Sequence, residues 1–135
     1  MIVPDTSVLI AALVSHHAAH QRAVDAVGDA PGLIMHVAFE TTSVLSRMPE
    51  GQRIEATVVL DALEREFPEP WLALDRDAQR SCLRSAIDAG LRGGALYDAL
   101  IAATAHAHGA ALLSADRRAR GAYEAMGADV VFVDC

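Results

Sequence analysis

Four acidic residues of this sequence lie where parallel α/β proteins build their sites. Each follows a short apolar run or begins a helical pattern, in a segment otherwise composed for burial: Asp5, Glu40, Asp98 and Asp116. The carboxyl ends of parallel strands open toward one edge of a sheet, so we expect the four carboxylates to meet in one cleft. Carboxylates that lie close together cannot all stay ionised without cations. Hard oxygen ligands of this kind select Mg²⁺ or Mn²⁺, which bridge to substrate phosphates.

These groups predict metal-assisted hydrolysis of a phosphodiester bond. One ion would lower the pKa of a bound water to generate the nucleophile, and a second, roughly 3.5 to 4 Å away, would stabilise the leaving oxygen. Three of the four acids also have a simpler interpretation. Asp5 can be only a helix cap, and Glu40 or Asp98 only an acid near a helix start, where negative charge is mildly stabilising. At Asp98 the apolar surroundings disfavour that interpretation, because an unpaired buried carboxylate is costly.

The apolar pattern alternates between strands and helices. Short runs typical of buried strands occur at 2–4, 33–35, 71–74, 110–113 and 129–133. Helical spacing follows residue 5 and recurs over 19–27, 37–48, 52–67, 78–89 and 95–108. Thr6 or Ser7 is expected to cap the first helix, and Asp75 or Asp77 a later one. Strands separated by helices imply parallel pairing, hence an α/β fold: a three-layer α/β/α sandwich with a short parallel sheet.

Length and composition favour one domain, 1–135, with a core built from Ala, Val, Leu and Ile, since hydrophobic residues make up 53% and aromatics only 4%. No apolar run approaches the ~18 residues of a membrane span and no signal segment is recognisable, so we expect a cytoplasmic protein with no membrane partner. Cys82 and Cys135 lack metal-ligand spacing and are interpreted as incidental thiols.

The net charge and the absence of lysine exclude some functional classes. The formal net charge is −7, which argues against non-specific polyanion binding by the whole surface but not against RNA held by local arginines and cations. All eleven basic residues are arginines. A receiver domain or a phosphatase of the haloacid dehalogenase type would also place an aspartate after the first strand, but both need a lysine. The phosphatase also needs an aspartate where this chain has Ser7.

Two clusters of basic or ionisable side chains remain open to interpretation. Arg117, Arg118 and Arg120 follow Asp116, and their guanidinium groups could hold RNA phosphates bidentately or simply form a solvated helix start. The second cluster contains His16, His17 and His20. His16 and His20 are four residues apart and could share a metal, but no third ligand is in sight, which favours solvated histidines.

The sequence resembles the PIN-domain ribonucleases, in particular the VapC toxins of bacterial toxin–antitoxin pairs. The resemblance covers the whole chain. It rests on the segment VPDTSVL at 3–9, on the lone Glu40 that opens a helix, on GGALYDALIA at 93–102 and on LLSADRRA at 112–119. The order and spacing of these segments together are more specific than any one of them.

The resemblance implies roles for individual residues. Asp5, Glu40, Asp98 and Asp116 match the metal-binding and catalytic acids, and Thr6 and Ser114 match the supporting hydroxyls. Two positions depart from the pattern. Ser7 stands where many members carry Asn, and Ala119 stands where some carry a further acid, which leaves the occupancy of a second metal site open.

The resemblance also implies an activity and partners. We expect a Mg²⁺- or Mn²⁺-dependent endoribonuclease that cuts structured RNA such as tRNA or rRNA, a homodimer, and a cognate VapB-type antitoxin that occludes the cleft. The alternative is a PIN-like interaction module that has lost catalysis. Retention of all four acids argues against that alternative.

Overall fold

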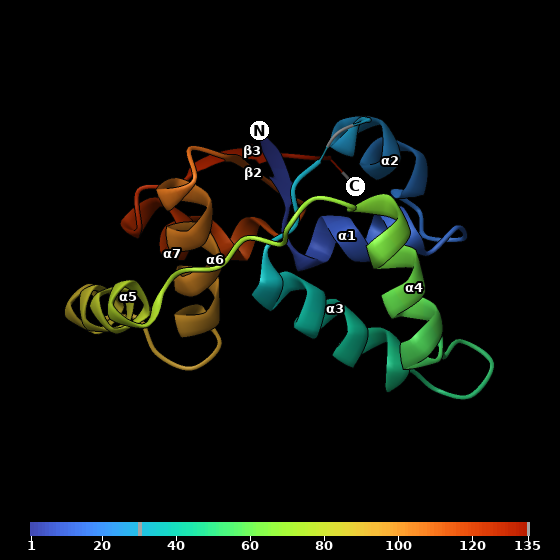
Figure 1. The fold of residues 1–135 in the computed structure, drawn as a ribbon, viewed down its shortest axis with the longest axis horizontal. Coiled ribbons are helices and arrows are strands. Elements are labelled where there is room, and N and C mark those ends of the chain that lie inside the picture. Colours follow the sequence, from blue (N-terminus) through green and yellow to red (C-terminus); the bar gives the residue numbers. More distant parts are fainter. Residues whose placement is uncertain (30, 135) are drawn as a thin grey trace.

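The computed structural model describes residues 1–29 and 31–134, so Cys135 lies outside the described residues. Strands and helices alternate only in part, because a run of helices separates the first strand from the second (Figure 1). The elements are β1 (Ile2–Pro4), α1 (Thr6–Leu13), α2 (His20–Val27), α3 (Met35–Ser46), α4 (Ala56–Glu66), α5 (Arg76–Asp88), α6 (Ala95–Ala107), β2 (Ala111–Ser114), the 3₁₀ helix η1 (Arg117–Ala119), α7 (Arg120–Ala125) and β3 (Asp129–Phe132).

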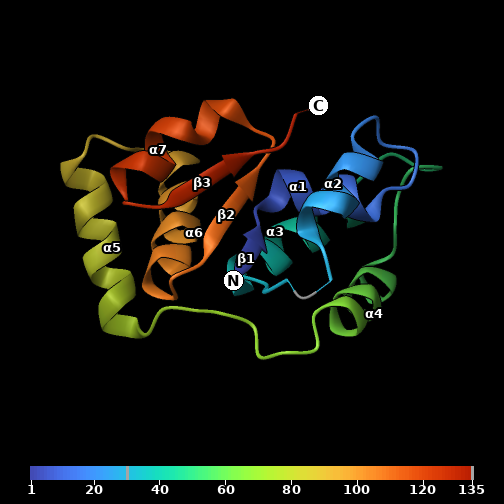
Figure 2. The ribbon, with the colours of Figure 1, turned by 90° about the horizontal axis from the view of Figure 1, so that it is seen from above.

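The sheet has three parallel strands in the order β1-β2-β3, side by side in Figure 2. The predictions of strands at 33–35 and 71–74 were wrong, since these segments make a single parallel bridge between Ile34 and Leu72. Two features prevent a longer ladder. Helix α3 begins at Met35, directly after the bridge. On the other side Pro68 and Pro70 have no backbone N–H to donate.

Helices pack on both faces of the sheet. Side chains alternate along a strand, so Leu112 and Leu113 of β2 point to opposite faces. Leu113 packs with residues of α1, with the N-cap of α2 and with α2 itself: Val8, Ala11, Ala19 and Ala23. Leu112 belongs to the main core, together with Ile101, Ala102 and Ala105 of α6 and Tyr123 of α7. The predicted three-layer α/β/α sandwich is therefore confirmed.

Two helical pairs extend from the sheet. Helices α3 and α4 form one pair and α5 and α6 the other, and the extended segment 67–75 runs across the molecule between them (Figures 1 and 2). Glu40 lies in the first pair and Asp98 in the second. The fold thus brings these acids to the strand ends from two sides. Within the described residues no helix is long and apolar enough to cross a membrane.

The helix boundaries correct two predictions. Asp5 is the N-cap of α1, and its carboxylate accepts from the Val8 N–H, whereas neither Thr6 nor Ser7 caps that helix. Helix α3 begins two residues before the predicted start at 37, so Glu40 lies in its second turn and not in its first. Asp75 rather than Asp77 caps α5.

Candidate functional site

Asp5 is the most tightly held of the predicted site residues. Its backbone N–H donates to the Leu113 carbonyl across 2.8 Å, which fixes the end of β1 beside β2. Its side chain is only 2% exposed. One carboxylate oxygen, Oδ1, accepts from the Val8 N–H at 3.1 Å and the Ser7 hydroxyl at 2.5 Å, while Oδ2 accepts from the Tyr123 hydroxyl at 2.8 Å. Asp5 is therefore a helix cap and also a fixed acid at the strand edge.

The sequence analysis missed Tyr123. This residue lies in α7, is 2% exposed and reaches Asp5 across 118 positions of sequence. Burial, and then the charge of Asp5, raise the pKa of Tyr123 far above its usual range, so the phenol stays protonated and donates. No spacing pattern could have revealed this contact. The only signal was a large aromatic residue in a chain that has few.

Asp116 is held by the turn that follows β2. Its N–H donates to the Ser114 hydroxyl at 3.0 Å, and its Oδ1 accepts from the Arg118 N–H at 3.0 Å, so Asp116 caps η1. The Ser7 hydroxyl accepts from the Ala115 N–H at 2.9 Å while donating to Asp5. Ser7 therefore links the first acid to the turn that carries the fourth.

Glu40 faces the start of α1. The Thr6 hydroxyl donates to its Oε1 at 3.1 Å, and the His36 Nε2 lies 3.5 Å from the same oxygen. The His36 ring stacks on Tyr97 with 5.1 Å between centroids and 6° between planes. Because His36 is on α3 and Tyr97 on α6, this stack holds together the helices that carry Glu40 and Asp98.

Asp98 shows that the acids converge. Burial, and then the charges of Glu40, Asp116 and Asp5, raise the pKa of Asp98 from its ordinary 3.8 to about 6. Each of the other three acids contributes, so Glu40, Asp116 and Asp5 all lie within electrostatic reach of Asp98. That the four carboxylates form one metal site stays a prediction.

No three acidic, histidine or cysteine side chains among residues 1–29 and 31–134 are arranged so that they could hold a metal ion as they stand. The donor set nevertheless fits a hard divalent cation. Its atoms are carboxylate oxygens. Burial, and after it repulsion from the other acids, raises the pKa of Asp98, and a nearby cation would offset both effects. Hydrogen bonds already orient Asp5, Asp116 and Glu40.

The predicted histidine cluster has other contacts. His17 Nδ1 accepts from the Ala19 N–H at 3.0 Å, and His20 Nδ1 lies 2.9 Å from the Ala11 carbonyl. These contacts hold the segment between α1 and α2. They favour the interpretation of the histidines as structural or solvated.

The three arginines after Asp116 differ in their surroundings. Arg117 pairs with Asp134 at 3.1 Å, and the guanidinium carbons of Arg117 and Arg120 lie 4.9 and 4.7 Å from the centre of the Phe132 ring. Arg118 is different, because its side chain is 94% exposed and its Nε lies 3.2 Å from the Asp116 carboxylate. A surface hollow beside Asp116 includes Arg117 and Arg118 in its lining. Arg118 is thus the arginine best placed to meet a ligand there.

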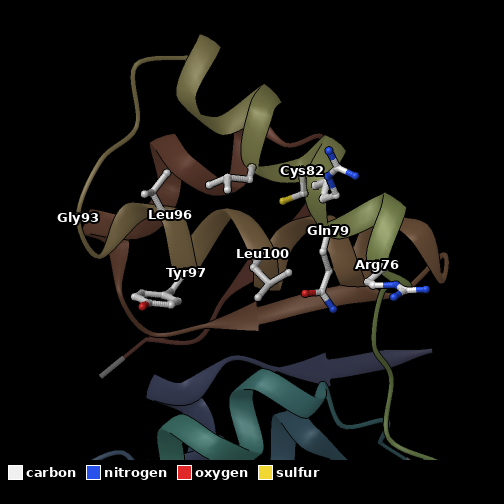
Figure 3. A pocket seen from close by; sticks show the side chains of 9 residues that line it. Arg76, Gln79, Cys82, Gly93, Leu96, Tyr97 and Leu100 are labelled. Carbon is white, nitrogen blue, oxygen red and sulfur yellow. The ribbon is translucent and has the colours of Figure 1, made fainter.

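A separate, mostly apolar pocket lies between α5 and α6 (Figure 3). Leu83, Leu96 and Leu100 line it together with Cys82. The Cys82 thiol is buried, and burial raises its pKa, which agrees with the interpretation of an unreactive thiol. Tyr97 lines the same pocket, so the pocket reaches the residue that precedes Asp98.

Comparison with known proteins agrees with this geometry. The family model described as PIN domain matches residues 2–125. The chain therefore belongs to the PIN-domain family. It is 41% identical to Ribonuclease VapC40 of Mycobacterium tuberculosis over 133 residues, which cover 98% of this chain and 99% of the relative. It is 38% identical to Ribonuclease VapC27 of the same species over 129 residues, which cover 94% and 93%. Within the family the chain is of the VapC type, as the sequence motifs predicted.

Solved structures confirm the fold. FitAcB from Neisseria gonorrhoeae matches with a TM-score of 0.70 at 22% identity, covering 96% of each chain. VapBC2 from Rickettsia felis, solved with a DNA fragment from its promoter, matches with a TM-score of 0.69 at 17% identity, covering 99% of this chain and 100% of that one. At these identities the likeness extends to the fold alone.

Proposed function

We propose that this chain is the toxin of a toxin–antitoxin pair and acts as a metal-dependent endoribonuclease on structured RNA such as tRNA or rRNA. Asp5, Glu40, Asp98 and Asp116 are its metal-binding and catalytic acids. The observation that carries the proposal is the set of contacts that link the segments bearing the acids: Ser7 bonds Asp5 and the turn of Asp116, Thr6 bonds Glu40, and His36 beside Glu40 stacks on Tyr97 beside Asp98. The relatives named as ribonucleases support the same activity.

The residues around the acids are suited to this role. A divalent cation bound there supplies an activated water and neutralises charge on the phosphate. Asp5 and Asp116 are oriented by hydrogen bonds before any ligand binds, and Thr6 holds Glu40. Asp98 retains partial burial and a raised pKa, so it gains most from a neighbouring cation. Preformed orientation of this kind reduces the cost of binding.

The choice of cation follows from the donor atoms. Carboxylate oxygens without thiolate or imidazole partners favour Mg²⁺ or Mn²⁺ over zinc or copper. Some members of the family carry a further acid at the position of Ala119, but here this residue is an alanine buried in the core, so the site has no fifth carboxylate. We therefore propose a site with four carboxylates that works with either Mg²⁺ or Mn²⁺.

The proposal includes two macromolecular partners besides RNA. One is a second copy of the chain, as the family resemblance implies. The other is a small VapB-type antitoxin that inserts a basic side chain or a peptide among the acids and blocks metal or RNA. The solved structures of FitAcB and of VapBC2, to which the chain is similar, support such a partner. Arg118, and less directly Arg117 and Arg120, would contact RNA phosphates.

The test is cleavage by the purified chain, freed of any partner. We expect it to cut a structured RNA when Mg²⁺ or Mn²⁺ is added, to stop in EDTA and to resume when metal is restored in excess. Undiminished cleavage in excess chelator would contradict the metal mechanism. If the chain neither cleaves RNA nor binds Mn²⁺, the alternative of an inactive interaction module takes its place.

A further inference from the structure

The carboxylate of Asp5 has little freedom left for a ligand. A carboxylate offers about four lone-pair positions on its two oxygens. Oδ1 already accepts two hydrogen bonds, from the Ser7 hydroxyl and the Val8 N–H. Oδ2 accepts one, from the Tyr123 hydroxyl. By this count the position that remains for a cation is on Oδ2, the oxygen that Tyr123 touches.

Tyr123 comes from a part of the chain remote from Asp5. Asp5 ends β1, and the two donors to Oδ1 come from the first turn of α1, which its own cap geometry holds in place. Tyr123 comes from α7, which follows the turn of Asp116. One hydroxyl thus ties the helix after the fourth acid to the first acid, at 2.8 Å and with both residues 2% exposed.

We propose that Tyr123 is a positioning residue for the metal site: its hydroxyl fixes Oδ2 of Asp5, so that this carboxylate presents one oxygen to a cation in one orientation. The inference rests on the proposed function, because it assumes that Asp5 is a metal ligand. It deepens that proposal by assigning a role to a residue that carries no charge and lies outside the four acids. Groups that hold a ligand by hydrogen bonds contribute strongly to metal affinity.

A purely structural role is the competing explanation. Tyr123 packs in the main core, and its hydroxyl could serve only to satisfy a buried carboxylate. The two explanations differ in what the hydroxyl changes. A structural hydroxyl affects unfolding, whereas a positioning hydroxyl also affects the affinity for Mn²⁺ of protein that remains folded.

The experiment compares Mn²⁺ affinity in the chain alone, from the electron paramagnetic resonance signal of free Mn²⁺ during titration. Tyr123→Phe keeps the ring that fills the core and removes the hydroxyl. We expect it to bind Mn²⁺ about tenfold more weakly, the lower end of what loss of such a supporting contact costs. Circular dichroism and thermal unfolding without metal establish that the variant is folded at the titration temperature.

Thr104→Val is the matched control. It removes another hydroxyl of a residue that is 2% exposed, one that donates to the Leu100 carbonyl of its own helix at 2.7 Å and has no contact with Asp5. We expect its Mn²⁺ affinity to equal that of the parent. Asp5→Asn defines the loss expected when the ligand itself is removed. If Tyr123→Phe proves unfolded at the titration temperature, all four proteins are titrated at a lower temperature in sucrose, which favours the folded state.

The outcomes separate this inference from the proposed function. If the parent binds Mn²⁺ and Tyr123→Phe binds it equally tightly, Tyr123 is structural and the inference alone is wrong. The same holds if Thr104→Val weakens binding as much as Tyr123→Phe does. If the parent binds no Mn²⁺, the metal centre of the proposed function is wrong, and the inference falls with it.

Discussion

Asp98 is the residue at which function and stability oppose each other. Its carboxylate is partly buried and is repelled by Glu40, Asp116 and Asp5. Asp98→Asn keeps the shape of the side chain and removes its charge. We expect the variant to lose RNA cleavage and yet, without metal near pH 7, to be as stable as the parent or more stable by on the order of 1 kcal/mol. Paired thermal unfolding with and without Mg²⁺ measures this.

Mg²⁺ provides the internal control for that variant. A ligand that binds only the folded state stabilises it by mass action, so Mg²⁺ should raise the melting temperature of the parent and raise that of Asp98→Asn much less. A variant that is clearly less stable than the parent without metal would mean that Asp98 is a structural acid of the first turn of α6. In that case the carboxylate would have no place in the proposed metal site.

The raised pKa of Asp98 also predicts how stability depends on pH. The folded protein binds this proton more tightly than the unfolded chain, because the pKa rises from 3.8 to about 6 on folding. Protonated Asp98 therefore favours the folded state, and its contribution to the free energy of unfolding falls as pH rises through about 4 to 6. Solvent screening of this partly exposed group limits the loss to on the order of 1 kcal/mol.

The measurement is the difference between two pH profiles. The free energy of unfolding of the metal-free parent is compared with that of Asp98→Asn from pH 4 to pH 7, so that titrating groups remote from Asp98 cancel and the difference reports Asp98 with the acids that it repels. We expect the parent to lose stability relative to the variant as pH rises. A constant difference over this range would show that Asp98 titrates normally.

At the scale of elements, the three arginines of the 3₁₀ helix η1 and the start of α7 have different surroundings. Arg117 and Arg120 pack on the Phe132 ring of β3, while the Arg118 side chain is 94% exposed beside Asp116. Arg118→Ala should weaken RNA binding whatever the RNA sequence and reduce the slope of log affinity against log salt by about 1, since one phosphate contact is lost. Binding titrations in Ca²⁺, which should not support cleavage, at several salt concentrations measure the slope.

Arg65→Ala is the matched control for Arg118. Arg65 is also exposed and also pairs with a neighbouring acid, Glu66, but it lies on α4. Its replacement should leave the salt slope unchanged. Equal slopes for the parent and Arg118→Ala would mean that Arg118 does not contact RNA phosphates and is only a solvated residue at a helix start.

Some of the strands could be predicted from the sequence and others could not. The strand ends at Asp5 and Asp116 were recognisable because a short apolar run stops directly on an acid or just before one, and parallel strands open to a common edge. The apolar runs at 33–35 and 71–74 had the same composition as strands. These two segments pair through one bridge only, because helix α3 begins at Met35 and two prolines precede the second segment. A pattern of hydrophobic residues alone does not take such interruptions into account.

Contacts between distant elements were beyond sequence reasoning. The hydrogen bond of Tyr123 to Asp5, the donation of Thr6 to Glu40 and the stack of His36 on Tyr97 all join helices that no spacing rule connects. The acids themselves could be predicted because charge in an apolar segment is conspicuous. Of the neutral groups that orient them, Thr6 and Ser114 were named only through the family resemblance, and Tyr123 was not predicted.

At the scale of the molecule, the chain has a net charge of −7, and Asp98 is repelled by three further acids, Glu40, Asp116 and Asp5. A partner that brings a basic side chain to that point relieves the same repulsion as a cation does. The candidate partner is a small VapB-type antitoxin. We expect its affinity to drop when Asp5, Asp98 and Asp116 are all replaced by Asn, because the site for the basic group is then neutral.

The control must remove equal charge elsewhere, since any loss of negative charge weakens a basic partner through the field of the whole protein. Asp61, Asp88 and Glu124 are exposed acids on three different helices, and neutralising all three changes the net charge by the same amount. Kd values measured by calorimetry at two salt concentrations should separate the variants. If the partner inserts a basic group among the acids, we expect a large loss of affinity for the cleft variant of Asp5, Asp98 and Asp116. For the control variant we expect a small loss of affinity that depends on salt. Equal affinity of the partner for the cleft variant and the parent would place its contact away from the acids.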